Sequence, residues 1–198
     1  MSGTTLAPGK SKHRPPGEVR IIGGQWKRRK LPVADKPGLR PTPDRVRETL
    51  FNWLGQDLSG WHCVDLFAGS GALGLEAASR GALSVLMFET DAALVKSLNA
   101  SCTRLGARQV RVQRGDGVAL ARALAPGSID LAFIDPPYAS ELFGPALLAV
   151  SAALKPEGRV YLEAPAPWDE AALQPLGYHL LRHRKAGAVH AHLLARAA

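Results

Sequence analysis

Short apolar runs alternate with segments of helical periodicity along most of this chain, and the alternation predicts an α/β fold. The segments expected to be strands are residues 62–67, 84–88, 109–113, 129–134 and 159–163, of which 62–67 and 129–134 are the most apolar runs. The segments with helical spacing are residues 71–80, 90–105, 117–124 and 142–154, with a further helical turn at 169–174. Because strands that are apolar throughout are buried on both faces, we expect a mainly parallel sheet with helices on either side.

Two hairpins are expected outside this alternation. Residues 178–195 have the pattern of a closing hairpin that turns at Gly187 and would place one antiparallel strand in the sheet. Residues 18–33 have the pattern of a basic hairpin, in which Gly23-Gly24 would form a tight two-residue turn.

A helix over residues 43–54 is expected to follow the first hairpin. Thr42 is a suitable N-cap, because its hydroxyl can accept from a free backbone N–H of the first turn. Pro43 stands at the first helical position, where a missing N–H costs nothing, and Asp44 brings a favourable negative charge to the first turn.

Composition and cysteine usage favour a cytoplasmic protein with one core. The chain has 198 residues, of which 46% are hydrophobic, and this is enough to bury a full core. No apolar run approaches the roughly 20 residues that a membrane-spanning helix needs. The N-terminal segment lacks the apolar stretch of a secretory signal peptide. Cys63 and Cys102 are expected to be buried reduced thiols, with no disulfide between them.

Positive charge is concentrated at the N-terminal end. Residues 1–47 contain 12 Lys and Arg against three acids, a balance of +9, whereas residues 48–198 contain 13 against 14, a balance of −1. A basic leader on a neutral body is typical of proteins that meet a polyanion, although a tail that only aids solubility would have the same charge. We expect a disordered basic tail at 1–17, an extension that binds nucleic acid at 18–57 and a globular domain at 58–198.

A glycine-rich turn after the first apolar run has the spacing of a nucleotide-binding loop. Residues 69–74 fit the pattern Gly-x-Gly-x-x-Gly, which in dinucleotide-binding folds lets the backbone approach a pyrophosphate. Asp65, four residues before the first glycine, argues against a pyrophosphate because its carboxylate would repel one. The same carboxylate suits the ammonium group of S-adenosylmethionine, a cofactor without phosphate.

Two further acids follow the next two strands and complete an expected cofactor site. Glu89 is placed to accept from ribose hydroxyls, and Asp116 from an adenine amino group. Either acid alone would more often be a solvated loop residue. The assignment to a cofactor site therefore depends on both acids lying, like Asp65, at the carboxyl ends of successive strands. The expected cofactor-binding residues are Asp65, Phe67, Ala68, Gly69, Ser70, Gly71, Glu89, Thr90, Asp116 and Gly117.

The apolar run 129–134 ends in a turn whose groups could hold a planar amine. Two prolines by themselves only terminate a strand, since they remove donors and restrict the backbone. Asp135 and the Pro136 carbonyl, however, offer two acceptors for amine hydrogens, and Tyr138 offers a flat face on which a base can stack. The residues expected to be catalytic, in a methyltransferase acting on a base amino group, are Asp135, Pro136, Pro137 and Tyr138.

The expected chemistry needs orientation more than a strong base. An exocyclic amine such as guanine N2 is a weak nucleophile because its lone pair is delocalised into the ring. Two acceptors that bind its hydrogens direct the lone pair at the methyl donor and stabilise the positive charge that develops on nitrogen. No metal is implied: the six histidines form no convincing ligand set, and His190 and His192 are expected to be exposed hairpin residues.

After residue 18, nearly the whole chain resembles the RsmD-type methyltransferases, which methylate a guanine N2 in bacterial small-subunit (16S) ribosomal RNA. The segments that carry the resemblance are 20–26, 38–51, 65–77 and 135–138. Within them, Arg-Pro-Thr-x-Asp-Arg-Val-Arg-Glu at 40–48 separates this family from other enzymes that contain Asp-Pro-Pro-Tyr.

The resemblance implies a Rossmann-like class I methyltransferase fold, with a seven-stranded, mainly parallel sheet and a C-terminal antiparallel strand. It implies S-adenosylmethionine as the methyl donor and ribosomal RNA, presented by an assembling small subunit, as the substrate. We expect a monomer that needs no metal and meets no membrane. The residues expected to bind RNA are Arg20, Lys27, Arg28, Arg29, Lys30, Arg40, Arg45 and Arg47.

Three other interpretations fit parts of the pattern. A DNA adenine-N6 methyltransferase could share the Asp-Pro-Pro-Tyr turn, but the chain has no obvious separate DNA-recognition region. A non-catalytic RNA-binding module of ribosome assembly could keep the fold, but it would not need Glu89, Asp116 and Asp135 all intact. A nicotinamide-dependent oxidoreductase is disfavoured by Asp65.

Overall fold

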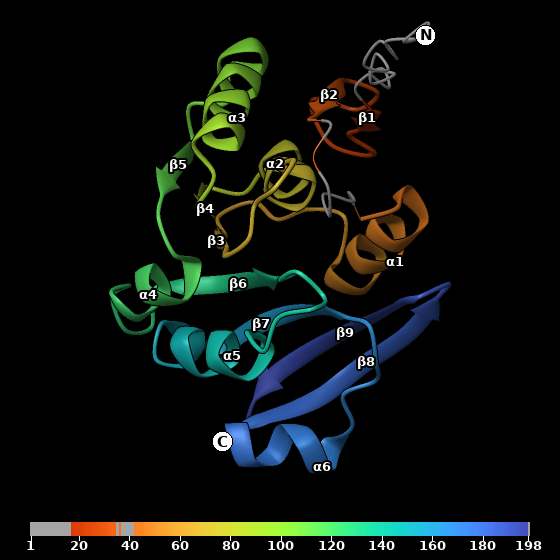
Figure 1. Ribbon diagram of the computed structural model, residues 1–198, viewed down its shortest axis with the longest axis vertical. Coiled ribbons are helices and arrows are strands. Elements are labelled where there is room, and N and C mark those ends of the chain that lie inside the picture. The colour runs from red at the N-terminus through yellow and green to blue at the C-terminus, as the bar shows by residue number, and fades with distance from the viewer. Residues whose placement is uncertain (1–16, 35, 37–41, 198) are drawn as a thin grey trace, which may run out of the picture.

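The computed structural model describes residues 17–34, 36 and 42–197, and a seven-stranded sheet forms its centre (Figure 1). The strand order is β5-β4-β3-β6-β7-β9-β8. The strands are β3 (His62–Asp65), β4 (Ser84–Glu89), β5 (Val110–Arg114), β6 (Ile129–Ile134), β7 (Leu154–Ala164), β8 (Tyr178–Ala186) and β9 (Val189–Arg196). Neighbours from β5 to β7 are parallel, whereas β9 is antiparallel to β7 and β8. The expected Rossmann-like sheet is confirmed.

Two hydrophobic cores lie on opposite faces of this sheet because successive strand residues point to opposite sides. In β6, Leu131 and Phe133 belong to one core, and Ala132 and Ile134 belong to the other. The helices over the first core are α1 (Asp44–Leu54), α2 (Ala72–Ser79) and α3 (Ala92–Leu105). Those over the second are α4 (Gly117–Arg122), α5 (Phe143–Ser151) and α6 (Glu170–Leu173), which a 3-10 turn (Gln174–Leu176) follows.

The largest departure from the expected strands concerns β7. Helix α5 ends at Ser151, and Leu154 already pairs with Ile129 at the start of β7. The register then shifts, so that Arg159 pairs with Leu131. A proline and a glycine in between give this stretch the appearance of a loop in the sequence. The structure accommodates the additional residues as an irregularity within one 11-residue strand.

The N-terminal hairpin forms, but the two-residue turn expected at Gly23-Gly24 is wrong. Strands β1 (Gly17–Arg20) and β2 (Lys30–Val33) pair in a small separate sheet, and residues 21–29 connect them. Figure 1 shows this hairpin beside α2 and α3, away from the central sheet. The connection is long because its backbone bonds to α2 as well as within the hairpin.

Four backbone amides make this attachment to α2, and one of them, the Trp26 N–H, donates to the Ser79 hydroxyl at 2.9 Å. The N–H groups of Ile22 and Gly23 donate to the carboxylate of Glu76, each at 2.8 Å. The N–H of Gln25 donates to the Ser79 carbonyl, also at 2.8 Å. Buried residues of the hairpin and its connection belong to the first core, so this N-terminal extension packs directly on the rest of the molecule.

Some expectations fall partly outside the described residues. Of the tail expected at 1–17, only Gly17 is described, and Arg40 is not. Among the described helices, none is both long and apolar enough to cross a membrane. Cys63 is buried and Cys102 is half-buried, and both thiols are free.

Candidate active site

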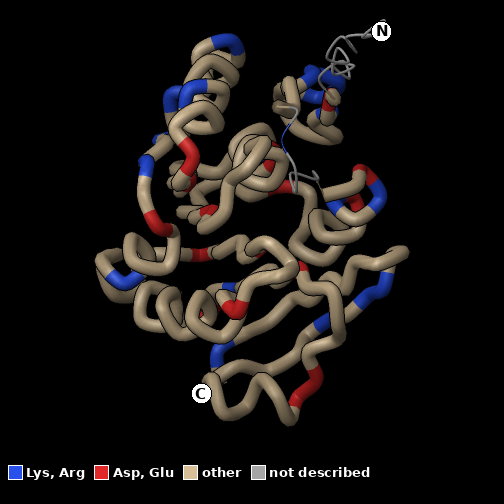
Figure 2. Tube along the Cα trace, in the orientation of Figure 1, with Lys and Arg blue, Asp and Glu red and all other residues tan. Residues whose placement is uncertain are grey.

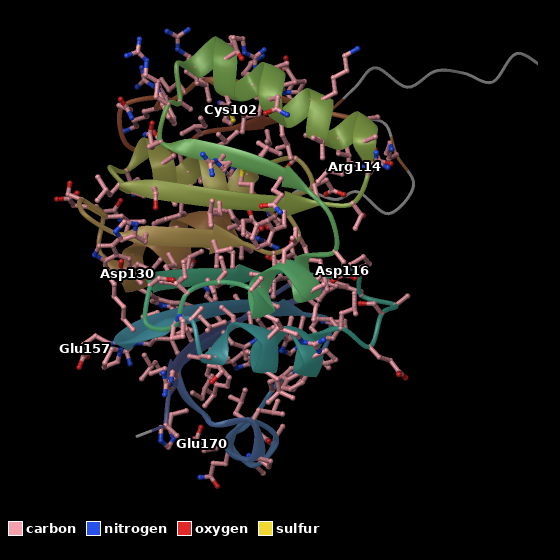
Figure 3. The ribbon with its side chains drawn as sticks, turned by 90° about the vertical axis from the view of Figure 1, so that its left-hand side faces the viewer. Cys102, Arg114, Asp116, Asp130, Glu157 and Glu170 are labelled. Carbon is pink, nitrogen blue, oxygen red and sulfur yellow. The ribbon has the colours of Figure 1, made fainter. Side chains whose placement is uncertain are left out.

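Acidic side chains gather at the carboxyl edge of the parallel strands. They are Asp65 and Glu89 at the ends of β3 and β4, Asp116 and Asp135 just after β5 and β6, and Glu163 near the end of β7. Since β3 to β7 are parallel, these strand ends meet at one side of the sheet. In Figure 3, Asp116 lies at that end of the strands, opposite Asp130 near the start of β6. The fold therefore brings the expected acids to one edge.

Asp65 is a buried carboxylate with few compensating contacts. Only 1% of the residue is exposed. Its Oδ1 accepts from the Phe67 N–H at 3.3 Å and its Oδ2 from the Gly74 N–H at 3.2 Å. Both are longer than the roughly 2.8 Å of a strong charge-assisted bond. Burial, reinforced by the charge of Glu89, raises the pKa of Asp65 to about 7. A cationic group at this point would stabilise the charged form.

The glycine-rich turn needs its glycines for separate reasons. Gly71 has a left-handed φ of 79° where it caps α2. A Cβ at Gly74 would lie 2.7 Å from the sulfur of Met87, so a larger residue there would require the Met87 side chain to move. The Gly69 N–H donates to the Glu89 carboxylate at 2.9 Å. A turn whose first amide is held by a carboxylate is poorly suited to a pyrophosphate and better suited to a cofactor without phosphate.

Glu89 and Asp116 use part of their carboxylates to hold their own loops. Oε1 of Glu89 accepts from the Asp91 N–H at 2.9 Å and from the Thr90 hydroxyl at 3.4 Å. Asp116 caps α4, where its Oδ1 accepts from the Ala119 N–H at 2.9 Å. Because a carboxylate has about four acceptor positions, both residues keep capacity for hydroxyl or amino donors.

The other residues expected at the cofactor site lie before α2 or at the start of α4. Phe67, Ala68 and Ser70 belong to the turn between β3 and α2. Gly117 is the first residue of α4, and a Cβ there would lie 1.9 Å from the Leu66 carbonyl oxygen. Only glycine permits this close approach of the two loops.

Asp135 connects the site to the N-terminal extension. Its Oδ2 accepts from the Thr42 hydroxyl at 3.5 Å. The expectation that Thr42 caps α1 is therefore wrong, because Pro43 occupies the cap position and no side chain caps the helix. Burial, followed by the charges of Glu163 and Asp65, raises the pKa of Asp135 well above its ordinary value.

Glu163 is a site residue that the sequence analysis missed. Its side chain is almost entirely buried; Oε2 accepts from the Tyr161 hydroxyl at 2.9 Å and Oε1 from the Tyr138 hydroxyl at 3.3 Å. Tyr138 is 39% exposed, so its ring remains accessible, and in the same turn Pro136 is buried and Pro137 exposed. Burial raises the pKa of Glu163.

The signal for Glu163 was present in the sequence. Glu163 follows the apolar residues 160–162, as Asp65 follows an apolar stretch of its own strand. Unlike Asp65 and Asp135, Glu163 is not followed by a glycine turn or a Pro-Pro turn. Only the parallel pairing of β7 with β6 brings it beside Asp135. Two carboxyl groups that are buried together tend to share one proton, so their titrations belong to the pair.

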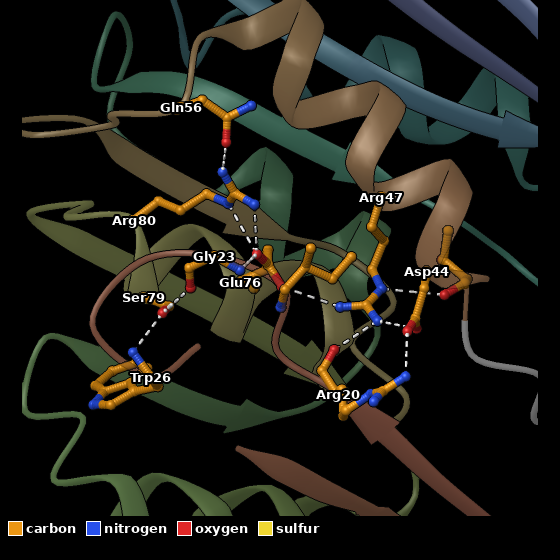
Figure 4. Close-up of polar contacts among 12 residues, drawn as sticks. Arg20, Gly23, Trp26, Asp44, Arg47, Gln56, Glu76, Ser79 and Arg80 are labelled. Atoms are coloured by element: carbon orange, nitrogen blue, oxygen red, sulfur yellow. Dashed lines mark hydrogen bonds and ion pairs between the residues drawn. The ribbon is translucent and has the colours of Figure 1, made fainter. Parts of the chain in front are cut away.

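Arg47 is not available to bind RNA, and the expectation that it does so is wrong. The side chain is fully buried. Its Nη1 lies 3.1 Å from Oε2 of Glu76, and its Nη2 lies 2.7 Å from Oδ1 of Asp44 and 2.7 Å from the Arg20 carbonyl oxygen (Figure 4). Every strong contact of this guanidinium is internal, so Arg47 joins α1 to α2 and to β1.

The other described residues expected to bind RNA are on the surface. They are Arg20, Lys27, Arg28, Arg29, Lys30 and Arg45. Arg20 lies 3.7 Å from Asp44, and Lys30 lies 2.7 Å from Glu18, but both basic side chains remain 63% exposed. Exposed pairs of this kind are weak and leave the cations accessible to a polyanion.

His190 and His192 are buried, and the expectation that they are exposed is wrong. The Nε2 of His192 accepts from the Trp168 N–H at 3.0 Å, and its Nδ1 lies 3.1 Å from the Leu162 carbonyl oxygen. Burial lowers the pKa of His192 to about 4, so the ring is neutral near neutral pH. The expectation failed because β9 lies inside the sheet, between β7 and β8, and not at its edge.

Known proteins with similar sequences are methyltransferases. A family model described as "Conserved hypothetical protein 95" matches residues 19–195. The "Ribosomal RNA small subunit methyltransferase D" of Escherichia coli (strain K12) is 43% identical over 183 residues, which cover 91% of each chain. The protein of the same name from Haemophilus influenzae is 39% identical over 178 residues, covering 87% of this chain and 91% of that one.

Solved structures agree with the fold. The protein yhhF from Escherichia coli superimposes with a TM-score of 0.79 at 37% identity, covering 91% of this chain and 99% of that one. A protein from Haemophilus influenzae superimposes with a TM-score of 0.75 at 33% identity, covering 92% and 100%. The expected methyltransferase fold is thereby confirmed.

Proposed function

The chain belongs to the RsmD family, and on that premise we propose that it transfers a methyl group from S-adenosylmethionine to the N2 amine of a guanine in small-subunit ribosomal RNA. The observation that carries the proposal is the position of Asp135, next to Glu163 and on the same sheet edge as Asp65. An amine-binding turn and a cation-binding carboxylate are thus adjacent. The names of the relatives supply the class of RNA.

The residues of the first half of the site fit S-adenosylmethionine. Asp65, buried and held by only two long hydrogen bonds, would accept from the cofactor's ammonium group. Glu89 and Asp116, with acceptor capacity left, would hold the ribose hydroxyls and the adenine amine. When bound, the cofactor supplies a methyl group on a positively charged sulfur. The acids hold that cofactor, and the glycine turn lets the backbone lie close to it.

The residues of the second half of the site orient the amine. Asp135 and the Pro136 carbonyl would accept its two hydrogens, while the exposed ring of Tyr138 stacks on the base. Glu163 holds the Tyr138 hydroxyl and so limits the ring's motion. Negative charge at Asp135 stabilises the positive charge that develops on the nitrogen. Asp135 is also the nearest acceptor for the proton that the methylated nitrogen releases.

The basic residues of the extension, apart from the buried Arg47, would bind the RNA backbone. We assign this role to Arg20, Lys27, Arg28, Arg29, Lys30, Arg40 and Arg45, and we propose that a cytoplasmic monomer meets the RNA in an assembling small subunit. The buried network of Arg47 and Glu76 fixes the extension on α2, so RNA bound there has a defined position relative to Asp135.

Nucleoside analysis by mass spectrometry tests the proposal. Small subunits from cells that lack this protein are incubated with the protein and isotopically labelled S-adenosylmethionine, and their RNA is digested to nucleosides. We expect labelled N2-methylguanosine, and little or none with an Asp135→Ala variant. Labelled N6-methyladenosine would identify a different amine, and the absence of any labelled nucleoside would contradict the proposal as a whole.

A further inference from the structure

The edge strand β8 carries an exposed run of basic residues near its end, Arg182-His183-Arg184-Lys185. Strand alternation directs Arg182 and Arg184 to the same face of the sheet. Their partners in β9 identify that face, because Arg182 pairs with Leu193 and Arg184 pairs with Ala191. Leu193 and Ala191 belong to the core beneath α1, so both arginines lie on the α1 side.

Helix α1 brings a third arginine to the same place. The Nη1 of Arg184 donates to the Thr49 hydroxyl of α1 at 3.4 Å. Arg45 lies one turn earlier in α1, is exposed, and has its Nη2 3.5 Å from the position of a Cβ at Gly187, in the turn between β8 and β9. Arg45 and Arg184 therefore lie where α1 meets the β8–β9 hairpin, with Arg182 next along the same face of β8, and we call these three residues the arginine surface.

The arginine surface has no acidic partner within the described part of the chain. None of the ion pairs found there involves its three members. The acids of α1 are engaged elsewhere, since Asp44 contacts Arg20 and Arg47. Glu48, three residues after Arg45, lines the hollow beside Gly23 and forms none of the ion pairs found in the described residues. Three guanidinium groups on one face, with no ion pair to an acid of the described residues, suit an external anion.

The arginine surface lies near the part of the active site that contains Glu163 and Tyr138. Arg184 pairs with Ala191 in β9, and Ala191 pairs with Glu163 in β7, so the three form one row across the sheet. Glu163 in turn contacts Tyr138. Figure 2 shows the basic positions along β8 beneath α1, well apart from the N-terminal hairpin. The charge balance of −1 over residues 48–198 conceals this local excess.

We propose that the arginine surface binds the phosphate backbone of the substrate RNA beside the base that is methylated. The proposal rests on the proposed function for the identity of the polyanion. Arginine suits this role because its planar group donates two hydrogen bonds to one phosphate. The N-terminal hairpin and the arginine surface would then bind the RNA at two separate places, and the base would enter between them.

The test compares two triple variants that remove the same charge. One is Arg45→Ala with Arg182→Ala and Arg184→Ala. The matched control is Arg108→Ala with Arg111→Ala and Arg122→Ala, three exposed residues in and around β5 and α4, toward the opposite edge of the sheet. Methyl transfer to unmethylated small subunits and binding to the same subunits are both measured between low and moderate salt, together with S-adenosylmethionine affinity.

We expect the KM for subunits to rise about tenfold to a hundredfold in the arginine-surface variant. The slope of log affinity against log salt should fall by about two, since each lost phosphate contact lowers it by roughly 0.7–0.9. The control variant should differ little from the wild type in all of these measurements. In the arginine-surface variant, the rate at saturating subunits and the cofactor affinity should also change little. A second variant with lysine at all three positions keeps the charge and should keep most of the salt slope, which separates lost charge from misfolding.

Different failures have different meanings. If the wild-type protein methylates RNA but the arginine-surface variant matches the control in KM and salt slope, the surface is not an RNA site. A loss of affinity with an unchanged salt slope would indicate contact with a ribosomal protein, which also overturns the assignment to RNA. If the wild type methylates no RNA, the proposed function fails, and the binding measurements still decide whether this surface holds a polyanion.

Discussion

The Nη1 of Arg47 lies 3.1 Å from Oε2 of Glu76, and neither side chain is exposed to solvent. Glu76 also accepts from the N–H groups of Ile22 and Gly23 and from Arg80. The Glu76 carboxylate in α2 therefore holds both the hairpin connection and α1. Because its neighbours are buried cations and amides, its charge cannot be removed without leaving them unpaired.

Glu76→Gln should lower the free energy of unfolding by about 3–5 kcal/mol, the usual cost of breaking a buried ion pair from one side. Urea denaturation measures this. Glu157→Gln is the matched control, because that side chain is 93% exposed, and we expect a change within about 0.5 kcal/mol. Equal stability of the two variants would mean that the Glu76 network does not hold the extension in place.

Asp65→Asn should stabilise the free protein in a pH-dependent way. The folded-state pKa of Asp65 is about 7, above the ordinary value of 3.8. Because the charged form is buried, the wild type loses stability as the pH rises from the lower to the higher of these values. The variant should match the wild type near pH 4 and exceed it by on the order of 4 kcal/mol at pH 8. Its affinity for S-adenosylmethionine should fall by about 1.5–3 kcal/mol. Denaturation at both pH values and calorimetry check the two effects; tight NADH binding would contradict the cofactor assignment.

Glu163→Gln should move the acidic limb of the pH–rate profile to lower pH. The charge of Glu163 helps to raise the pKa of Asp135, and methyl transfer needs Asp135 in its charged form. Glutamine keeps an acceptor for Tyr161 and Tyr138 but removes the charge. Single-turnover methyl transfer across pH, with Glu157→Gln as the control, measures the shift. An unmoved limb would show that Glu163 does not tune Asp135.

Asp135→Ala should lower the rate of methyl transfer by on the order of 100–1000-fold, the usual cost of losing one preorganised electrostatic partner. Cofactor binding at Asp65 should persist. Tyr138→Ala should weaken base capture, whereas Tyr138→Phe keeps the stacking face and should remain substantially active. Transfer to small subunits under single-turnover conditions distinguishes these variants. If the phenylalanine variant is as inactive as the alanine variant, the hydroxyl held by Glu163 is the important group.

Reversing Lys27, Arg28, Arg29 and Lys30 to glutamate should weaken RNA binding and flatten its salt dependence, because fewer counterions are released. Cofactor affinity should change little, since these exposed side chains lie in and beside the hairpin connection, away from the acids of the sheet edge. Filter binding over a salt series measures the effect. An unaltered slope would reassign the hairpin to a role in folding or solubility.

Features that depend on neighbouring residues could be predicted from the sequence. The run 129–134 is apolar except for Asp130 and is followed by Asp-Pro-Pro, and the structure has β6 at the same bounds. The glycine turn and Asp65 are close in the chain, so their spacing already predicts a ligand site at a strand end. Local periodicity and turn chemistry suffice for such features because strand alternation and backbone restrictions act over a few residues.

Features made by residues far apart in the chain could not be predicted from the sequence, because they depend on how the elements pack. Arg47 resembles a surface residue in a basic segment, but α2 presents Glu76 to it and buries both. The arginine surface requires Arg184 to meet Thr49 across 135 positions, a contact that charge counting cannot anticipate. Both cases have the same cause. The charge and solvation of a polar group depend on what surrounds it in space, and sheet pairing and helix packing bring that surrounding together.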